Sequence, residues 1–547
     1  KATMGGWLRN LRARMTAGGV RTLCARVPPS LGTLDAIGLD LAALTAEGVF
    51  EFLTLGINYD SFLPQDSDFG AIKAQVPKEF QLNWEVSYVE RQKQTASCSH
   101  GPDQRMTKAH LATSAHQAYY LGAAGMSGFN FQYYRQYADK PCMLEENSPY
   151  SEPPFGTLAK LKDPEWVAQQ HQYYWSNNKH TVSRTPTAIT MVLVPPTGGW
   201  RVDGKVRINY SGSGQLSLRM NGRTLIQTTD TAIPWESEYA DRFEDEYSAW
   251  QLPAVLVHTG SNSLQITLTS STDESDAVTI THVDILLPSG DGPAPVPPPP
   301  KTLHFNNDLT NTLTCISPFH TNRSSGFTRE VLAGSVRETA KIGVQTHLLA
   351  PGFSWVPWWN STLAPPAAHD AWYKSAFNFT GAAGGDFFAY VLRGSRGVDA
   401  PDSGDILGEF VSLTKSIGQR GALSFRIADY QFCNRNPDGN YEDLSEFWFS
   451  HRLDPSFMIS GKPFDDAACR QNKTTGKESG HCNCDAMASM SWSHPEVALR
   501  RQALLVEAIR MYPTLDVEVD FLRSPILFNT STTPLLQRAA VLRTFFV

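Results

Sequence analysis

The chain has 547 residues, of which 41% are hydrophobic and 18% are charged, and its formal net charge is −7. A chain of this length exceeds one ordinary hydrophobic core, so we expect two or three domains. Nucleic-acid-binding domains usually carry a basic face, and a membrane-spanning helix needs about 18 or more consecutive apolar residues. The sequence has neither feature, which argues against a nucleic-acid partner and against a membrane span.

Strands and helices alternate along the first 150 residues. Alternating apolar and polar residues predict four strands, at residues 20–27, 50–59, 81–90 and 127–134. Helices are predicted at residues 1–15, 34–47, 69–75 and 107–122. This alternation is typical of parallel βαβ units.

The pattern changes after residue 150. Residues 151–185 form a connecting segment with one predicted helix at residues 164–175. Residues 186–290 contain a series of short alternating strands without helices, and Asn221-Gly222 among them favours a type I′ hairpin turn. Such a series predicts an all-β sandwich domain. The proline-rich residues 291–300 then form a stiff polyproline II linker.

The α/β pattern resumes in residues 301–547. Strands are predicted at residues 303–308, 344–349, 422–430 and 515–522. Ser493 and Glu496 form a predicted capping box, with Pro495 in the first turn, that begins the helix before the last strand. Neither half of the chain supplies enough strands to close a parallel barrel alone, whereas together they do. The predicted fold class is therefore α/β: a (β/α)8 TIM barrel assembled from residues 301–547 plus 1–150, with an all-β sandwich domain.

One predicted strand carries acids along a single face. In residues 515–522, Asp516, Glu518 and Asp520 alternate with apolar residues, so the three acids share one side of the strand. Ionised carboxylates are costly to bury unpaired, so this side suits a polar barrel lumen. Barrel chemistry is located at the C-terminal ends of the strands, which makes Asp520 the first catalytic candidate and Glu518 the next, one layer deeper. The alternative is an acid–Arg network that only stabilises the barrel.

Six runs of residues carry a family resemblance. They are residues 305–308 (Phe-Asn-Asn-Asp), 424–429 (Ser-Phe-Arg-Ile-Ala-Asp), 516–525 (Asp-Val-Glu-Val-Asp-Phe-Leu-Arg-Ser-Pro), 26–28 (Arg-Val-Pro), 38–40 (Gly-Leu-Asp) and 129–134 (Phe-Asn-Phe-Gln-Tyr-Tyr). Read as residues 301–547 followed by 1–290, the chain resembles a largely uncharacterised glycoside-hydrolase-like TIM-barrel family with an appended β-sandwich. The family pattern has Asn where this chain has Ala428, which removes a polar group from the implied site.

The order of the chain looks circularly permuted relative to that family. Strands one to four follow the proline-rich linker, and strands five to eight open the numbering. A permuted gene, a cut tandem repeat and a processed chain all fit this order. The linker itself resembles the hydroxyproline-rich linkers of green-algal surface glycoproteins.

Cleavage of a glycosidic bond usually needs two carboxyl groups that flank the bond. The resemblance implies a pair at the ends of strands four and seven, with Asp520 or Glu518 on strand four. In strand seven, alternation favours Glu85 facing the lumen, whereas position at the strand end slightly favours Glu90. The alternative for Glu90 is a solvated loop acid. Asp429, at the end of strand three, is a further candidate because a neighbouring Arg would keep it ionised.

Four polar residues at other strand ends are candidates for substrate binding. Arg426 ends strand three and Arg26 ends strand five, and either would hold a carboxylate ionised or form a structural salt bridge. Asn306 and Asp308 close strand one, where they would bind sugar hydroxyls or cap a turn.

Aromatic residues follow the strand ends as well. Trp355, Trp358 and Tyr133 are candidates to stack on sugar faces, and packing under long loops is the alternative. Histidines are scattered without His-x-x-x-His spacing, and no glycine-rich phosphate loop stands out. We therefore expect no metal and no cofactor.

Cysteines and glycosylation sequons indicate the secretory pathway. An even number of cysteines in loop-like surroundings favours disulfides over metal ligands. The predicted disulfide cysteines are Cys98, Cys142, Cys433, Cys469, Cys482 and Cys484, the last four within a loop at residues 433–484. Cys24 lies inside a predicted strand and is expected to be a buried free thiol. Asn-x-Ser/Thr sequons begin at Asn209, Asn322, Asn360, Asn378, Asn472 and Asn529.

Two functions fit these features. The first is a secreted glycoside-hydrolase-like protein that acts on or binds a cell-wall or surface polysaccharide by a two-carboxylate mechanism. The second is a catalytically inactive structural repeat module of an extracellular glycoprotein assembly, such as a wall, a fibre or a ciliary appendage. Its partners would be other copies of itself or neighbouring repeats. A purely carbohydrate-binding protein is a third possibility.

Overall fold

The structure of the chain is a computed structural model. It describes residues 2–17, 19, 22–56, 61–92, 103–135, 152–235, 246–270, 277–289, 301–309, 312, 317–319, 328–353, 356–365, 368, 371–372, 375, 405–427, 445–464 and 489–522. The proline-rich linker and most of the loop at 433–484 lie outside these residues.

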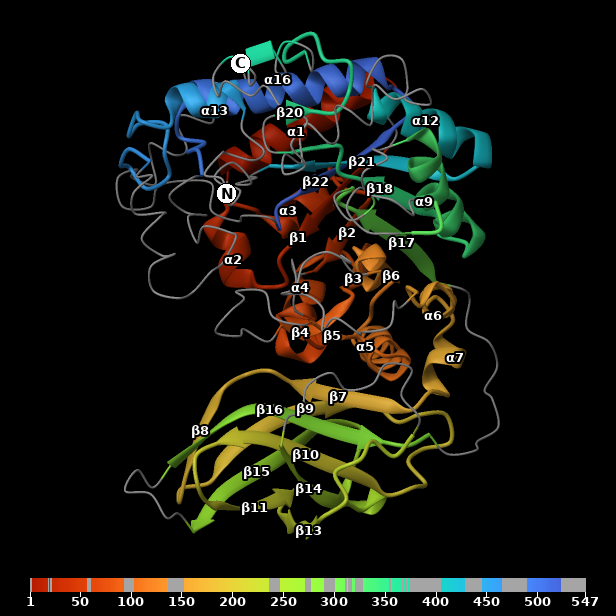
Figure 1. The fold of residues 1–547 in the computed structure, drawn as a ribbon, viewed down its shortest axis with the longest axis vertical. Coiled ribbons are helices and arrows are strands. Elements are labelled where there is room, and N and C mark those ends of the chain that lie inside the picture. Colours follow the sequence, from red (N-terminus) through yellow and green to blue (C-terminus); the bar gives the residue numbers. More distant parts are fainter. Residues whose placement is uncertain are drawn as a thin grey trace.

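Eight parallel strands close into one barrel (Figure 1). In barrel order they are β1 (Leu23–Val27), β2 (Phe52–Leu55), β3 (Gln81–Val86), β6 (Gly125–Phe129), β17 (Thr302–Asn307), β18 (Thr346–Leu349), β21 (Arg420–Arg426) and β22 (Asp516–Asp520). The pairings β6–β17 and β22–β1 join the two halves of the chain. The predicted eight-stranded parallel barrel, with four strands from each half, is therefore confirmed.

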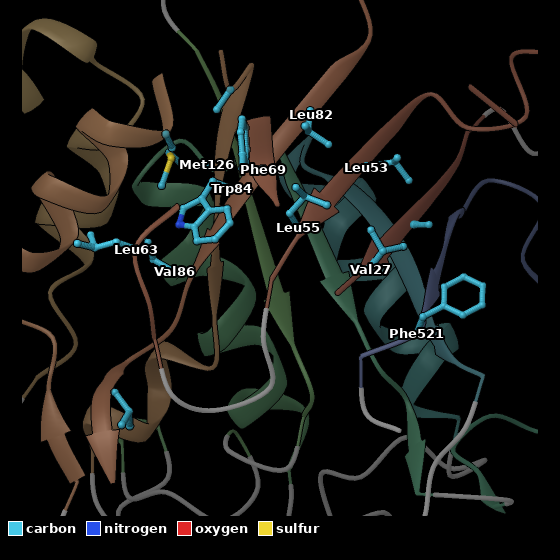
Figure 2. Packing of buried hydrophobic residues seen from close by; sticks show 14 of the residues in the cluster. Val27, Leu53, Leu55, Leu63, Phe69, Leu82, Trp84, Val86, Met126 and Phe521 are labelled. Carbon is cyan, nitrogen blue, oxygen red and sulfur yellow. The ribbon is translucent and has the colours of Figure 1, made fainter. Parts of the chain in front are cut away.

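Helices surround the barrel (Figure 1). They include α1 (Ala2–Ala17), α4 (Phe69–Gln75), α5 (Lys108–Tyr120), α9 (Arg329–Lys341), α12 (Ile406–Ile417) and α16 (Pro495–Met511). The outward residues of the strands pack against them, as Figure 2 shows for Trp84 and Phe69, whose ring centroids are 5.9 Å apart. Trp84 also donates from Nε1 to Ser114 Oγ of α5 at 2.9 Å. Most apolar residues of the strands point outward, and the residues between them, among them the polar ones, point into the lumen.

Two helix predictions were wrong in detail. The helix expected over residues 34–47 is divided into α2 (Leu31–Ala36) and α3 (Leu41–Ala46). Gly38 adopts a φ of 78° between them, and the side chain of Asp40 then caps α3. The predicted capping box before α16 is absent, because His494 is the N-cap residue and makes no side-chain capping hydrogen bond. Pro495 is nevertheless the first residue of the helix, as predicted.

The helix predicted over residues 164–175 was too long. It ends early, as α7 (Pro164–Ala168), and its second half is a strand, β7 (Gln172–Ser176). Every residue of β7 is buried, and aromatic side chains such as Tyr173 and Trp175 favour the extended pleated backbone.

Two antiparallel sheets follow the first half of the barrel in sequence (Figure 1). The larger contains β7, β8 (His180–Ser183), β10 (Gly204–Ser211), β13 (Ile226–Thr228), β14 (Tyr247–Leu252) and β16 (Ala277–Leu287). The smaller contains β9 (Thr187–Leu193), β11 (Gln215–Met220), β12 (Arg223–Thr224) and β15 (Gly260–Ser270). Asn221 and Gly222 both have positive φ between β11 and β12, as the hairpin prediction requires. The larger sheet thus begins inside the segment expected to be only a connection, and a sandwich bounded at residues 186 and 290 stays a prediction.

Candidate functional site

The acidic face of β22 points into the barrel lumen. Glu518 Oε1 accepts hydrogen bonds from Asn306 Nδ2 of β17 at 2.6 Å and from Ser424 Oγ of β21 at 2.7 Å. Strand β21 pairs directly with β22, whereas β17 lies three strands away from β22 around the barrel. Asp516 lies at the other end of the strand and is paired with Arg420. The strand therefore carries acids from one end of the lumen to the other.

Arg26 connects two carboxylates at the C-terminal ends of their strands. Its Nη2 and Nε lie 2.6 and 2.8 Å from Oε1 and Oε2 of Glu85 on β3, and its Nη1 lies 3.2 Å from Asp520 Oδ2 on β22. All three side chains are only 1% exposed. Gly56 leaves room for this arrangement, since a Cβ there would lie 2.3 Å from Glu85 Oε1. The lumen thus holds a carboxylate from strand four and one from strand seven, on either side of one guanidinium.

A second arginine extends the network toward strand one. Arg426 Nε lies 3.9 Å from Asp520 Oδ2, and its Nη2 lies 3.5 Å from Asp308 Oδ2. Asn130 Nδ2 donates to the same Asp308 oxygen at 2.8 Å. Charges of alternating sign therefore follow one another around the barrel, from Glu85 through Arg26, Asp520 and Arg426 to Asp308.

The backbone at the end of this network is unusual. Asn130 has φ 54° and Leu309 has φ 63°, both in the left-handed region that L-residues seldom adopt. Such conformations cost roughly 1–3 kcal/mol and cluster at functional sites. Asn130 was not among the candidate site residues predicted from the sequence. An Asn at a strand end is the signal that could have found it, because Asn tolerates positive φ better than most residues.

Burial and neighbouring charges shift the pKa values of several groups in the lumen. Burial, helped by the charge of Asp520, raises the pKa of Glu518 to about 8. Burial also raises the pKa of Glu85, although Arg26 opposes the shift. Burial disfavours the charged form of Arg26, but Glu85 and Asp520 outweigh it and raise the guanidinium pKa. The site therefore combines an acid that keeps its proton near neutral pH with a carboxylate, Asp520, that faces two guanidinium groups.

The lumen also holds a small apolar cluster. Cys24, Phe52, Leu348 and Ala422 form a small buried cluster there, and Phe52 stacks on His304 with centroids 4.5 Å apart. Cys24 is a buried free thiol, as predicted, and burial raises its pKa well above the usual range. In the strand register Cys24 is level with Glu518 and Ala422 is level with Asp516, so this cluster shares the lower lumen with acids of β22.

Glu90 is not in the lumen. It lies on β4 (Val89–Gln92), which pairs with β5 (Asp103–Arg105) in a hairpin after β3. Its carboxylate faces the larger antiparallel sheet, with Oε1 3.8 Å from His282 Nδ1. Of the two strand-seven candidates, the structure places Glu85 beside Asp520 and Glu90 away from it.

The aromatic candidates gain little support. Trp358 is 3% exposed and packs in the main hydrophobic core, so its ring does not form an open stacking surface in this structure. Trp355, the side chain of Tyr133, and Asp429 lie outside the described residues, as does Ala428.

Few of the predicted disulfide cysteines and sequon asparagines lie within the described residues. All six predicted disulfide cysteines lie outside the described residues, so the disulfides stay a prediction. Two sequon asparagines are described. Asn360 is exposed, whereas Asn209 is partly buried in β10, where its Nδ2 donates to Glu246 O at 3.2 Å.

Two searches of the described residues gave negative results. No group of three or more His, Cys, Asp or Glu side chains among them is arranged to hold a metal ion. No helix in the same part of the chain is long and apolar enough to cross a membrane.

Comparison with known proteins adds only distant likenesses. No protein-family model matches the chain, and no curated protein matches it. A GH31 α-xylosidase from Xanthomonas citri is similar at 10% identity and a TM-score of 0.19, over 65% of this chain and 34% of that chain. The YxiM protein from Bacillus subtilis has 13% identity and a TM-score of 0.11, over 47% and 68% of the two chains. An acetyl xylan esterase from the rumen bacterium Butyrivibrio proteoclasticus has 10% identity and a TM-score of 0.12, over 64% and 80%.

This chain therefore spans only about a third of the xylosidase it matches. Likenesses with TM-scores this low carry no argument about activity, so the function must be argued from the side chains.

Proposed function

We propose that this chain is a secreted glycoside-hydrolase-like protein that acts on or binds a cell-wall or surface polysaccharide. The observation that carries the proposal is the position of Glu85 and Asp520. Both lie at the C-terminal ends of barrel strands and both contact Arg26. Two carboxyl groups in this position are the minimum that glycosidic cleavage requires. The sequons and the even number of cysteines support the extracellular setting.

The surroundings of the two acids suggest their roles. Asp520 lies 3.2 Å from Arg26 Nη1 and 3.9 Å from Arg426 Nε, so it would be the nucleophile or the stabiliser of positive charge on the sugar. Glu85 has a raised pKa and would be the proton donor. Asn306 and Asp308 lie at the C-terminal end of β17 and would bind sugar hydroxyls.

A second candidate function is favoured by a specific observation. Arg26 contacts both carboxylates, and the three side chains are almost completely buried. A network of this kind also suits a structural module that has lost its activity, in an extracellular assembly of identical or neighbouring repeats. In that case Asp520 would serve folding rather than chemistry.

One set of variants separates these functions. Asp520→Asn and Glu85→Gln keep the shapes of the side chains but remove their charges, and Asp516→Asn is the matched control on the same strand. Release of reducing sugar from a panel of wall glucans, xylans, mannans and galactans would be measured beside urea unfolding. A hydrolase should lose activity by orders of magnitude in the first two variants and retain it in the third. If no polysaccharide is cleaved or bound by the unaltered chain, and Asp520→Asn mainly lowers stability, the structural function is correct.

A further inference from the structure

A second buried charge cluster lies between the barrel and the larger antiparallel sheet. It contains Glu90 of β4, Arg207 of β10, and His282 and Asp284 of β16, none of them more than 3% exposed. Asp284 Oδ1 lies 2.6 Å from His282 Nε2, and Asp284 Oδ2 accepts from Arg207 Nη2 at 2.7 Å and from Nε at 3.0 Å. Glu90 Oε1 lies 3.8 Å from His282 Nδ1. This cluster is separate from the barrel acids and has no part in the chemistry proposed for them.

The hydrogen bonds define which atoms of His282 carry protons. Its Nε2 faces a carboxylate oxygen of Asp284, which can only accept. Its Nδ1 lies 2.7 Å from Asn177 Oδ1, which can also only accept. The orientation of the Asn177 amide is fixed independently, because its Nδ2 donates to the backbone oxygen of Glu90 at 3.2 Å. Turning the amide over would bring its oxygen against that carbonyl oxygen.

We propose that His282 is protonated on both ring nitrogens and that this buried imidazolium joins the antiparallel sheet to the loop that follows barrel strand β3. Two cations, Arg207 and His282, then face two anions, Glu90 and Asp284, among the described residues. A neutral ring would leave one Nδ1 or Nε2 lone pair directed at an acceptor.

The surrounding groups agree with this charge balance. Burial opposes ionisation of Asp284, but the charges of His282 and Arg207 prevail and hold its pKa below the usual range. Tyr173 accepts a hydrogen bond from Arg207 Nη2 at 2.9 Å, and Tyr247 lies under the guanidinium, with its ring centroid 4.4 Å away. His110 of α5 stacks on Tyr173 at 3.7 Å, and burial lowers its pKa to about 3. His110 is therefore neutral and adds no charge.

The position of the cluster lets it restrain the segment that follows β3. Glu90 follows Glu85 by only five residues, across the exit of β3. Asn177 and His282 hold both the backbone and the side chain of Glu90 against the sheet. The sheet thereby limits the movement of the segment that leaves the barrel next to Glu85.

The sign of one stability change tests the proposal. Glu90→Gln removes an anion that faces the imidazolium, so we expect the urea midpoint of the full chain to fall. If His282 is neutral, the same substitution removes no contact with a cation at His282, and the midpoint should stay the same or rise. Glu79→Gln, at an exposed position, is the matched control and should leave the midpoint unchanged.

Two further measurements test the proposal even if Glu90→Gln alone fails to fold. His282→Gln should also lower the midpoint. Glu90→Gln with His282→Gln should lose less than the sum of the single losses, because either substitution alone already breaks the contact between the two residues. Additive losses would overturn the proposal. In the unaltered chain labelled with ¹⁵N-histidine, the resonances that disappear in His282→Gln should show two protonated ring nitrogens. A single protonated nitrogen there would refute it.

Discussion

Arg26→Met gives the most direct measure of how the barrel site is held. The guanidinium contacts Glu85 at 2.6 and 2.8 Å and Asp520 at 3.2 Å, with 1% exposure on every side. Met has a similar length and remains apolar, so the substitution removes the charge with little change in packing. Removing one partner of a buried ion pair costs about 3–5 kcal/mol, mainly because the other charge is left uncompensated.

The loss should lie at the lower end of that range. Glu85 already has a raised pKa and can take up a proton when Arg26 is absent, and Asp520 keeps Arg426 at 3.9 Å. We therefore expect a loss of about 3 kcal/mol in the free energy of unfolding. Urea unfolding followed by tryptophan fluorescence would measure it. Adding Glu85→Gln should recover part of the loss, since the double variant leaves one carboxylate fewer without a partner.

An exposed ion pair provides the control. Arg9 and Glu47 are paired at the surface, with side chains 41% and 45% exposed. Surface pairs are screened by solvent, so Arg9→Met should change stability very little. If Arg26→Met is equally mild, or if Glu85→Gln adds fully to its cost, the buried network does not hold the site as argued.

Three other predictions concern the same barrel. Gly56→Ala should destabilise the chain by about 1–3 kcal/mol in urea unfolding, because the new Cβ would overlap the carboxylate of Glu85; Gly70→Ala, in open space on α4, should not. Glu518 has a folded pKa of about 8, above its ordinary 4.5, so its contribution to stability is complete below about pH 4.5 and is lost as the pH rises toward 8. Glu518→Gln should therefore flatten stability–pH curves over that window, and an unchanged slope would refute the shift. Cys24 should resist a thiol reagent in the native chain and react after unfolding; rapid native labelling, located by mass mapping, would contradict its burial.

The barrel was predictable because its signals are repeated and local. Each strand alternates apolar and polar residues, and β22 combines Val517 and Val519 outward with Glu518 and Asp520 inward. Counting such strands in both halves led to a single closed barrel. The helix around Gly38 was less predictable, because one residue with positive φ divides a periodic pattern without disturbing it.

The helix predicted over residues 164–175 was too long for a different reason. The aromatic residues of β7 follow a short helix without a strong breaker, so helical and extended patterns compete over residues 164–175. Pairing with β16, more than 100 residues away, decides in favour of the strand. Tertiary contacts of that range cannot be read from local propensity.

The choice between Glu85 and Glu90 shows what a sequence can and cannot settle in a site. Alternation favoured Glu85, and it was the better guide, because alternation holds as long as the strand continues. Position favoured Glu90, but β3 ends at Val86 and the chain then pairs with β5 in a hairpin. Strand β5 has no alternation of apolar and polar residues, so the sequence did not predict the hairpin of β4 and β5. Once it forms, Glu90 is directed toward His282 and its charge is used in the joint with the sheet. Glu90, which its position favoured as the catalytic acid, thus contacts the antiparallel sheet instead. Glu85 remains as the strand-seven acid beside Asp520.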